Sequence, residues 1–257
     1  MNIATALIGQ RKRVKNRHRT LLLKKILQHL PRSVDILLLP AGYYSTYENA
    51  KSLYTYVQGC CMKLLKRYAP QCTIVLGIDG RKHQDQIAIA INRKGIAGMA
   101  RKFYAVKGEI IKPAKDYLNG EAGYKRIFRL KGKDIYMAVC YDSFGIRHEE
   151  TKSPGVDIIL NLIHEFLPQG RMKSGDVYFI KHGMAGASKQ WACPVFGSTV
   201  FIRREIPKNW QPGVLWNQRS MSTQKWRYKH NPLKSRKGFK AETIREKAEI
   251  SLFLREK

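Results

Sequence analysis

The chain has 257 residues, of which 44% are hydrophobic, and its 48 lysines and arginines against 19 acidic residues give a net charge of +29. This hydrophobic share is ample for a buried core, and a chain of this length commonly folds as one α/β domain. No segment approaches the roughly 20 apolar residues of a membrane-spanning helix. Five cysteines, with Cys60 and Cys61 adjacent on a predicted helix, do not suit a disulfide framework.

Predicted strands alternate with predicted helices along the chain, which favours α/β layers. Apolar residues recur at helical spacing over residues 17–30 and 52–68. Apolar runs predict strands at 86–92, 135–139, 158–162 and 177–180, and a glycine-containing turn joins the first of these in a hairpin with residues 99–104. A short amphipathic helix is expected over residues 241–254, within a basic C-terminal extension at 221–257.

Cys140 follows the strand predicted at 135–139 and precedes Tyr141 and Asp142. A thiol where a buried strand turns into a loop is well placed to face a pocket, where the Tyr141 N–H could help to hold an oxyanion. A reactive thiol also needs a positive neighbour, and Lys102 falls early in the segment that leaves the predicted hairpin. The alternative is that Cys140 is inert core packing, as most buried cysteines are.

The positive charge is unevenly distributed along the chain. Residues 1–34 contain nine basic residues and no acidic one, and residues 225–230 interleave aromatic with basic side chains. Such clusters suit nucleic acid, and an acidic protein partner or a generally basic proteome would explain them equally well. If nucleic acid is the partner, we expect it to contact Arg11, Lys12, Arg13, Lys15 and Arg17.

Six segments, in chain order, carry a family resemblance. Residues 1–8 and 35–40 look like two successive buried strands, and residues 91–109 contain Lys102 and Glu109. Residues 139–142 (Val-Cys-Tyr-Asp) precede a strand-like segment at 155–161 and a glycine–serine turn into a strand at 196–201. Together they resemble the nitrilase, or carbon–nitrogen hydrolase, superfamily. The resemblance implies an α-β-β-α sandwich over residues 1–220, with two packed β-sheets flanked by helices.

The resemblance also implies a function, which is hydrolysis of a small amide or nitrile through a thioester or thioimidate. In the family pattern a cysteine nucleophile, a lysine and an accessory glutamate match Cys140, Lys102 and Glu109. Residues expected to line the substrate pocket are Tyr141, His164, Phe166 and His182.

Two positions depart from the family pattern. The general base of the family is a glutamate directly after the proline that ends the second strand, and here Ala41 follows that proline. The arginine expected two residues after Asp142 is replaced by Phe144. Glu109, Glu48 or Glu149 could substitute as base. Otherwise the chain is a degenerate scaffold that binds nucleic acid or a nucleotide through its basic surface without chemistry.

The remaining expectations concern cofactors, assembly and location. No cluster of cysteine and histidine has zinc spacing, so we expect neither a metal nor a cofactor. The resemblance implies a homodimer or a higher homo-oligomer. The basic residues follow the N-terminal apolar stretch instead of preceding it, the reverse of a secretory signal, so we expect a cytoplasmic protein without a membrane partner.

Overall fold

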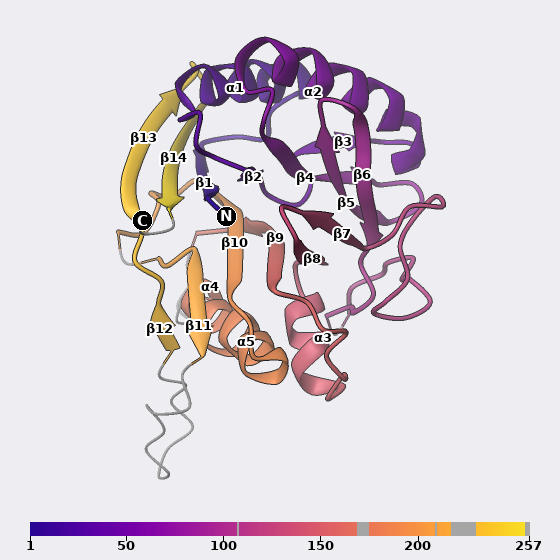
Figure 1. The fold of residues 1–257 in the computed structure, drawn as a ribbon. Coiled ribbons are helices and arrows are strands. Elements are labelled where there is room, and N and C mark those ends of the chain that lie inside the picture. The colour runs from indigo at the N-terminus through magenta and orange to yellow at the C-terminus, as the bar shows by residue number, and fades with distance from the viewer. Residues whose placement is uncertain (107, 169–174, 209, 217–229, 255–257) are drawn as a thin grey trace.

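The computed structural model describes residues 1–106, 108–168, 175–208, 210–216 and 230–254 (Figure 1). Its strands are β1 (Ile3–Gln10), β2 (Ile36–Leu38), β3 (Tyr44–Thr46), β4 (Thr73–Gly80), β5 (Asp85–Asn92), β6 (Gly95–Arg101), β7 (Ile127–Leu130), β8 (Lys133–Val139), β9 (Ile158–Phe166), β10 (Val195–Ile202), β11 (Gly213–Trp216), β12 (His230–Pro232), β13 (Arg236–Glu242) and β14 (Glu246–Phe253). Its helices are α1 (Asn16–His29), η1 (Ala50–Leu53), α2 (Tyr54–Tyr68), α3 (Asp142–His148), α4 (Gly175–Tyr178), the π-helix η2 (Phe179–Met184) and α5 (Ala185–Trp191).

One mixed sheet runs through the molecule in the order β6-β5-β4-β2-β1-β10-β9-β8-β7. The α/β prediction is confirmed, but the expected pair of separate sheets is not what the structure has. The reason is the parallel pairing of β1 with β10, which joins the two halves in one hydrogen-bonded sheet. The halves still face one another, because β8 contacts β5 and β6 although these strands are not its neighbours in the sheet.

Two hydrophobic clusters divide the core. One lies beneath α1 and α2, which cover one outer face of the sheet (Figure 1) and bury residues such as Leu22, Ile26 and Leu65. The other joins the inner faces of the two half-sheets to α3 and α5, and it contains both Ala41 and Cys140. The nucleophile candidate therefore lies where the inner core reaches the edge of the sheet.

The edge that carries the site is formed by the carboxyl ends of parallel strands. Strands β4, β2, β1, β10, β9 and β8 are successive parallel neighbours. Loops that leave the carboxyl ends of parallel strands converge on one edge, where α/β proteins commonly bind ligands. Ala41, Asp79, Cys140 and His164 lie near or just beyond the ends of β2, β4, β8 and β9 respectively.

Two predicted elements are wrong. Residues 241–254 form parts of strands β13 and β14 instead of a helix, and β14 pairs with the whole length of β1. The residues Glu246, Ala248 and Ile250 are buried in alternation with more exposed neighbours, which is the two-residue period of a strand. Residues 177–180, predicted as a strand, belong to α4 and η2. The predicted helices at 17–30 and 52–68 and the strands at 86–92, 135–139 and 158–162 are confirmed.

Candidate active site

Cys140 occupies a sharp turn between β8 and α3. Its φ of 51° lies in the left-handed region, which a non-glycine residue adopts at a cost and which is enriched at functional sites. Its amide donates a hydrogen bond to the Leu162 carbonyl at 2.7 Å, which continues the β8–β9 pairing by one residue. The side chain is 7% exposed. The thiol is thus presented from a fixed backbone.

Asp142 fixes that turn relative to the segment that carries Lys102. The side chain of Asp142 is fully buried, and it accepts hydrogen bonds from the amides of Phe103, Tyr104 and Val139 at 2.8, 3.0 and 3.0 Å. The guanidinium of Arg126, also fully buried, lies 3.2 Å from the same carboxylate. One carboxylate therefore holds together the end of β8 and the chain that follows β6. Arg126 supplies a cation to Asp142, although the position of the expected arginine is occupied by Phe144.

Lys102 and Glu109 form a close ion pair. The ammonium of Lys102, only 1% exposed, is 2.7 Å from both carboxylate oxygens of Glu109. Glu109 also accepts hydrogen bonds from the Gln86 amide and from Val106 N–H. Burial would raise the pKa of Glu109, but these hydrogen bonds and the charge of Lys102 outweigh it and lower the pKa. This carboxylate is suited to orienting the lysine, and it is poorly suited to accepting a proton.

His164, near the end of β9, connects Cys140 with Asp79. Its Nε2 atom lies 3.2 Å from both carboxylate oxygens of Asp79, at the end of β4. The Cys140 amide is bonded to the carbonyl of Leu162, two residues before His164, and hydrogen bonding and charge from His164 lower the pKa of the Cys140 thiol. Thr199 Oγ1 donates to the His164 carbonyl at 2.5 Å, which fixes the backbone from the β10 side. The result is a chain of three groups, carboxylate, imidazole and thiol.

The charges around Cys140 favour its thiolate. Burial would raise the pKa of the thiol, but the hydrogen bonds and charge of His164, with the charge of Lys102, outweigh burial and lower it. Burial would lower the pKa of His164, yet Asp79 and Cys140 raise it to about 10. By contrast, burial raises the pKa of Cys72 and Cys193 to about 12.

Of the three carboxylates considered as a substitute base, Glu109 is bound to Lys102, and the other two are exposed. Glu48 is exposed and is paired with Lys82 at 3.6 Å. Glu149 is exposed where α3 ends. Ala41 is 4% exposed, and its amide donates to the carbonyl of Ile163, the residue before His164, at 3.2 Å. The position where the family resemblance expects a carboxylate is therefore a backbone neighbour of the histidine.

The predicted pocket residues occupy different places. The ring of Tyr141 lies 5.8 Å from the Lys102 ammonium and stacks on Phe144. His164 lowers the pKa of the thiol, as described above. Phe166 packs in an aromatic cluster with Phe179, Phe201 and Trp210, and the ring of His182 stacks on that of Tyr178 with centroids 4.3 Å apart. The structure thus brings together Cys140, Lys102, Glu109, Tyr141 and His164, whereas Phe166 and His182 pack against other aromatic side chains.

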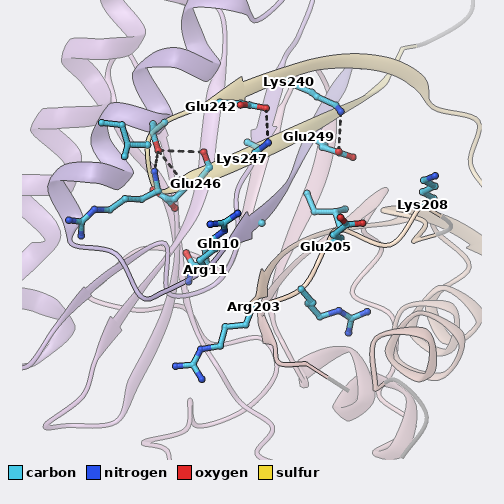
Figure 2. Close-up of a pocket in the computed structure, with 17 residues that line it drawn as sticks. Gln10, Arg11, Arg203, Glu205, Lys208, Lys240, Glu242, Glu246, Lys247 and Glu249 are labelled. Atoms are coloured by element: carbon cyan, nitrogen blue, oxygen red, sulfur yellow. Dashed lines mark hydrogen bonds and ion pairs between the residues drawn. The ribbon is translucent and has the colours of Figure 1, made fainter. Parts of the chain in front are cut away.

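A basic cavity lies elsewhere in the molecule, and Cys140 is not among the residues that line it. This cavity of about 990 Å³ is lined by residues 9–11, 203–206 and 208, and by residues 240 and 242–249 of the β13–β14 hairpin. Figure 2 shows that its acidic side chains are partly neutralised, with Lys240 paired to Glu249 and Lys247 to Glu242. Within the described part of the chain, four cations of the lining form no ion pair with an acidic side chain, namely Arg11, Arg203, Lys208 and Arg245.

The basic loop that the sequence singled out reaches this cavity. Arg11, Lys12, Arg13, Lys15 and Arg17 lie in or next to this loop. Arg11 and Lys12 line a smaller adjoining hollow with Arg245, and Arg13 pairs with Glu165 at 3.1 Å. Burial and then the charges of Arg245, Arg17 and Lys15 lower the pKa of His18. Residues 225–229 of the second basic segment lie outside the described residues.

Two further features bear on the class of protein. Among the residues that the structure describes, no group of three or more histidine, cysteine, aspartate or glutamate side chains could hold a metal ion. In the same residues, no helix is both long and apolar enough to cross a membrane.

The fold resembles that of known carbon–nitrogen hydrolases. No protein-family model and no curated protein matches the sequence. XC1258 from Xanthomonas campestris, a CN-hydrolase superfamily protein with an arsenic adduct in its active site, has a TM-score of 0.56 at 15% identity, over 82% of this chain and 78% of its own. The carbon–nitrogen hydrolase from Helicobacter pylori G27 has a TM-score of 0.55 at 14% identity, over 77% and 73%.

The amidase from Nesterenkonia sp. AN1 also has a similar fold. A mutant of it, which shows Michael addition of acrylamide at its active-site cysteine, has a TM-score of 0.52 at 14% identity, over 78% of each chain. At these identities the likeness shows a shared fold. What the site does must be argued from its own residues.

Proposed function

We propose that this protein is a carbon–nitrogen hydrolase that cleaves an amide or nitrile through a covalent intermediate on Cys140. The observation that carries the proposal is the carboxylate of Asp142, which binds both the Val139 amide beside the thiol and the two amides that follow Lys102. This bonding joins the backbone segments of Cys140 and Lys102, which are 38 positions apart, and so supports their acting in one site. The nitrilase-like fold supports the same reaction class.

The chemistry follows from the charges at the site. The Cys140 thiolate attacks the carbonyl or nitrile carbon and forms a thioester or thioimidate, which water then hydrolyses. The ammonium of Lys102, oriented by Glu109, stabilises the negative charge that develops on the substrate. The amide of Tyr141 is placed next to the sulfur in the chain and is the expected second donor to that charge.

Interception of the thioester tests this proposal. The protein is incubated with a panel of simple amides and nitriles together with hydroxylamine, which reacts with a thioester to give a hydroxamate. Wild type should form the hydroxamate, and Cys140→Ala should not. Cys193→Ala is the matched control, because this buried thiol has a raised pKa and should leave the rate unchanged. If wild type forms neither hydroxamate nor an adduct at Cys140, the hydrolase proposal is wrong.

The basic cavity supports a second candidate function, which is binding of nucleic acid. The cations Arg11, Arg203, Lys208 and Arg245 come from three separate segments and line one hollow. A phosphate backbone would neutralise them and release counterions, so affinity should fall steeply with salt. The absence of a glutamate at position 41 favours this function, whereas the groups assembled at Cys140 favour the enzyme.

Fluorescence anisotropy with a labelled single-stranded oligonucleotide separates the two functions. Arg11→Gln with Arg245→Gln should weaken binding and reduce the slope of log affinity against log salt by about one for each phosphate that is no longer neutralised. Lys63→Gln with Lys66→Gln removes the same charge from positions on α2 and should have a smaller effect. Absence of binding even at low salt, or equal weakening by both pairs, would contradict the assignment of the cavity.

A further inference from the structure

The active site lacks a carboxylate where a hydrolase of this fold is expected to have its general base, yet it contains an imidazole beside that position. The Ala41 amide donates a hydrogen bond to the Ile163 carbonyl, and His164 directly follows Ile163 in the chain. Hydrolysis of the intermediate needs a group that takes a proton from water, and loss of such a group commonly costs about 10²–10⁴-fold in rate. The backbone bonds of Cys140 to Leu162 and of Ala41 to Ile163 place His164 beside both positions, and His164 lowers the pKa of the thiol.

We propose that His164, held by Asp79, acts as the general acid and base for Cys140 in place of the absent carboxylate. The assignment rests on the proposed hydrolase function. In this role His164 acts on the reacting sulfur and is a catalytic residue. Asp79 contacts His164 through Nε2 at 3.2 Å and is a positioning residue. Cysteine, histidine and a carboxylate in a row are a known solution to nucleophilic catalysis on unrelated folds.

The backbone around Asp79 is shaped for this contact. Gly42 has a φ of 56°, and a Cβ atom built there would lie 2.5 Å from Asp79 Oδ2. A side chain at position 42 would thus displace the carboxylate that faces His164. The pair of small residues, Ala41 and Gly42, leaves room for Asp79 to approach the ring from β4, which pairs in parallel with β2.

The groups around His164 determine where its proton resides. Burial would lower the pKa of His164, but Asp79 and the Cys140 thiol raise it, and Lys102 lowers the pKa of that thiol. His164 and Asp79 line a cavity of about 230 Å³. Its other titratable or charged residues are Arg13, Arg19, Tyr43, Arg81 and Glu165. Arg13 is paired with Glu165, and Arg19 with Glu246. In the proposed resting state a Cys140 thiolate lies beside a His164 imidazolium.

The reaction then balances with water as the only co-reactant. The Cys140 thiolate forms a C–S bond to the amide carbon, and the C–N bond breaks as the imidazolium of His164 gives its proton to the leaving nitrogen. The neutral imidazole next accepts a proton from water as the hydroxide adds to the thioester. The C–S bond breaks, which releases the carboxylic acid and restores thiolate and imidazolium. Asp79 stabilises the imidazolium in both halves of the cycle.

The first test follows the ionisation of Cys140 by the pH dependence of its alkylation with iodoacetamide, read by mass spectrometry. Wild type should be labelled well below the ordinary thiol pKa of about 8.5. His164→Gln should move this profile upward and lower amide turnover about 10²–10⁴-fold. His83→Gln, in the exposed turn between β4 and β5, is the matched control and should change neither. A His164→Gln variant that folds and keeps both the wild-type profile and the rate would overturn the assignment.

Asp79→Asn tests the positioning role. It should lower the pKa of His164 toward its ordinary value of about 6.5, so the alkaline limit of turnover moves to lower pH. A purely structural carboxylate would lower the amount of folded protein without moving that limit.

A measurement on the wild-type protein needs no variant to fold. The His164 ring is titrated by NMR before and after alkylation of Cys140. Alkylation removes the thiolate and should lower the pKa of His164, because interacting groups titrate as a coupled pair. An unchanged pKa would refute the thiolate–imidazolium pair. If wild-type Cys140 is unreactive and forms no thioester, the hydrolase function itself fails. If it is reactive while His164 is uncoupled, only the histidine assignment fails.

Discussion

The carboxylate of Asp142 should be among the most costly side chains to remove. Asp142→Ala leaves the buried amide of Val139 without its acceptor and leaves the fully buried guanidinium of Arg126 without its counter-ion. Removing one partner of a buried ion pair costs about 3–5 kcal/mol, and an unsatisfied buried amide costs about 1–3 kcal/mol more. The expected loss, about 4 kcal/mol or more, is a large part of the stability of a typical domain.

Urea unfolding followed by tryptophan fluorescence measures this loss. Asp142→Asn keeps the shape and one acceptor oxygen, so it should cost less than the alanine variant. It should also slow alkylation of Cys140, because the turn is no longer fixed to the Lys102 segment. Glu249→Ala, which removes an exposed partner of Lys240, should change stability by less than about 1 kcal/mol. If Asp142→Ala costs no more than this control, the reasoning about the turn is wrong.

Three further variants test the site. Ala41→Glu should lower the turnover rate, because it places a charge in an enclosed position beside His164, the proposed base. A rise in rate that disappears with Cys140→Ala would show instead that the wild-type site lacks a base. Glu109→Gln should be less stable than wild type above about pH 5. The difference in Tm should shrink as pH falls below the ordinary carboxyl pKa of about 4.3, because the pKa of Glu109 is lowered in the native protein. A difference in Tm that does not change with pH would contradict the ion pair. Lys102→Met should move the alkylation profile of Cys140 to higher pH, and an unchanged profile would remove the lysine from the electrostatics of the thiol.

Local patterns in the sequence were enough to predict the elements that precede Cys140 and Lys102. The strand before Cys140 and the hairpin before Lys102 are confirmed as β8 and as β5 with β6. Each depends on neighbouring residues alone, since alternation and turn residues encode strands and hairpins locally. The catalytic role of either residue remains a proposal.

The base candidate was not recognisable from local sequence. Asp79 and His164 are 85 positions apart and meet only because β4 and β9 end at the same edge of one sheet. His164 was predicted to line the pocket, but nothing in its own neighbourhood indicated contact with the sulfur. Arg126 was missed for the same reason, because its partner Asp142 lies in α3, 16 positions further along the chain.

The C-terminal segment shows how a pattern can be misinterpreted. Residues 241–254 have apolar residues compatible with a helix, but β14 buries every second side chain from Glu246 onward. Pairing with β1 decides the outcome, because a strand added along the full length of β1 satisfies its backbone groups. Local propensity is commonly overridden by such tertiary pairing.

Competitive alkylation of the cysteines tests the central claim most directly. Native protein is treated briefly with iodoacetamide near neutral pH, and the labelling rate of each cysteine is read by mass spectrometry. Although it is only 7% exposed, Cys140 should react faster than Cys60, Cys61, Cys72 and Cys193, because its pKa is lowered while burial raises those of the last three. Equal rates, or labelling led by the less buried Cys60, would identify Cys140 as core packing and would contradict the account.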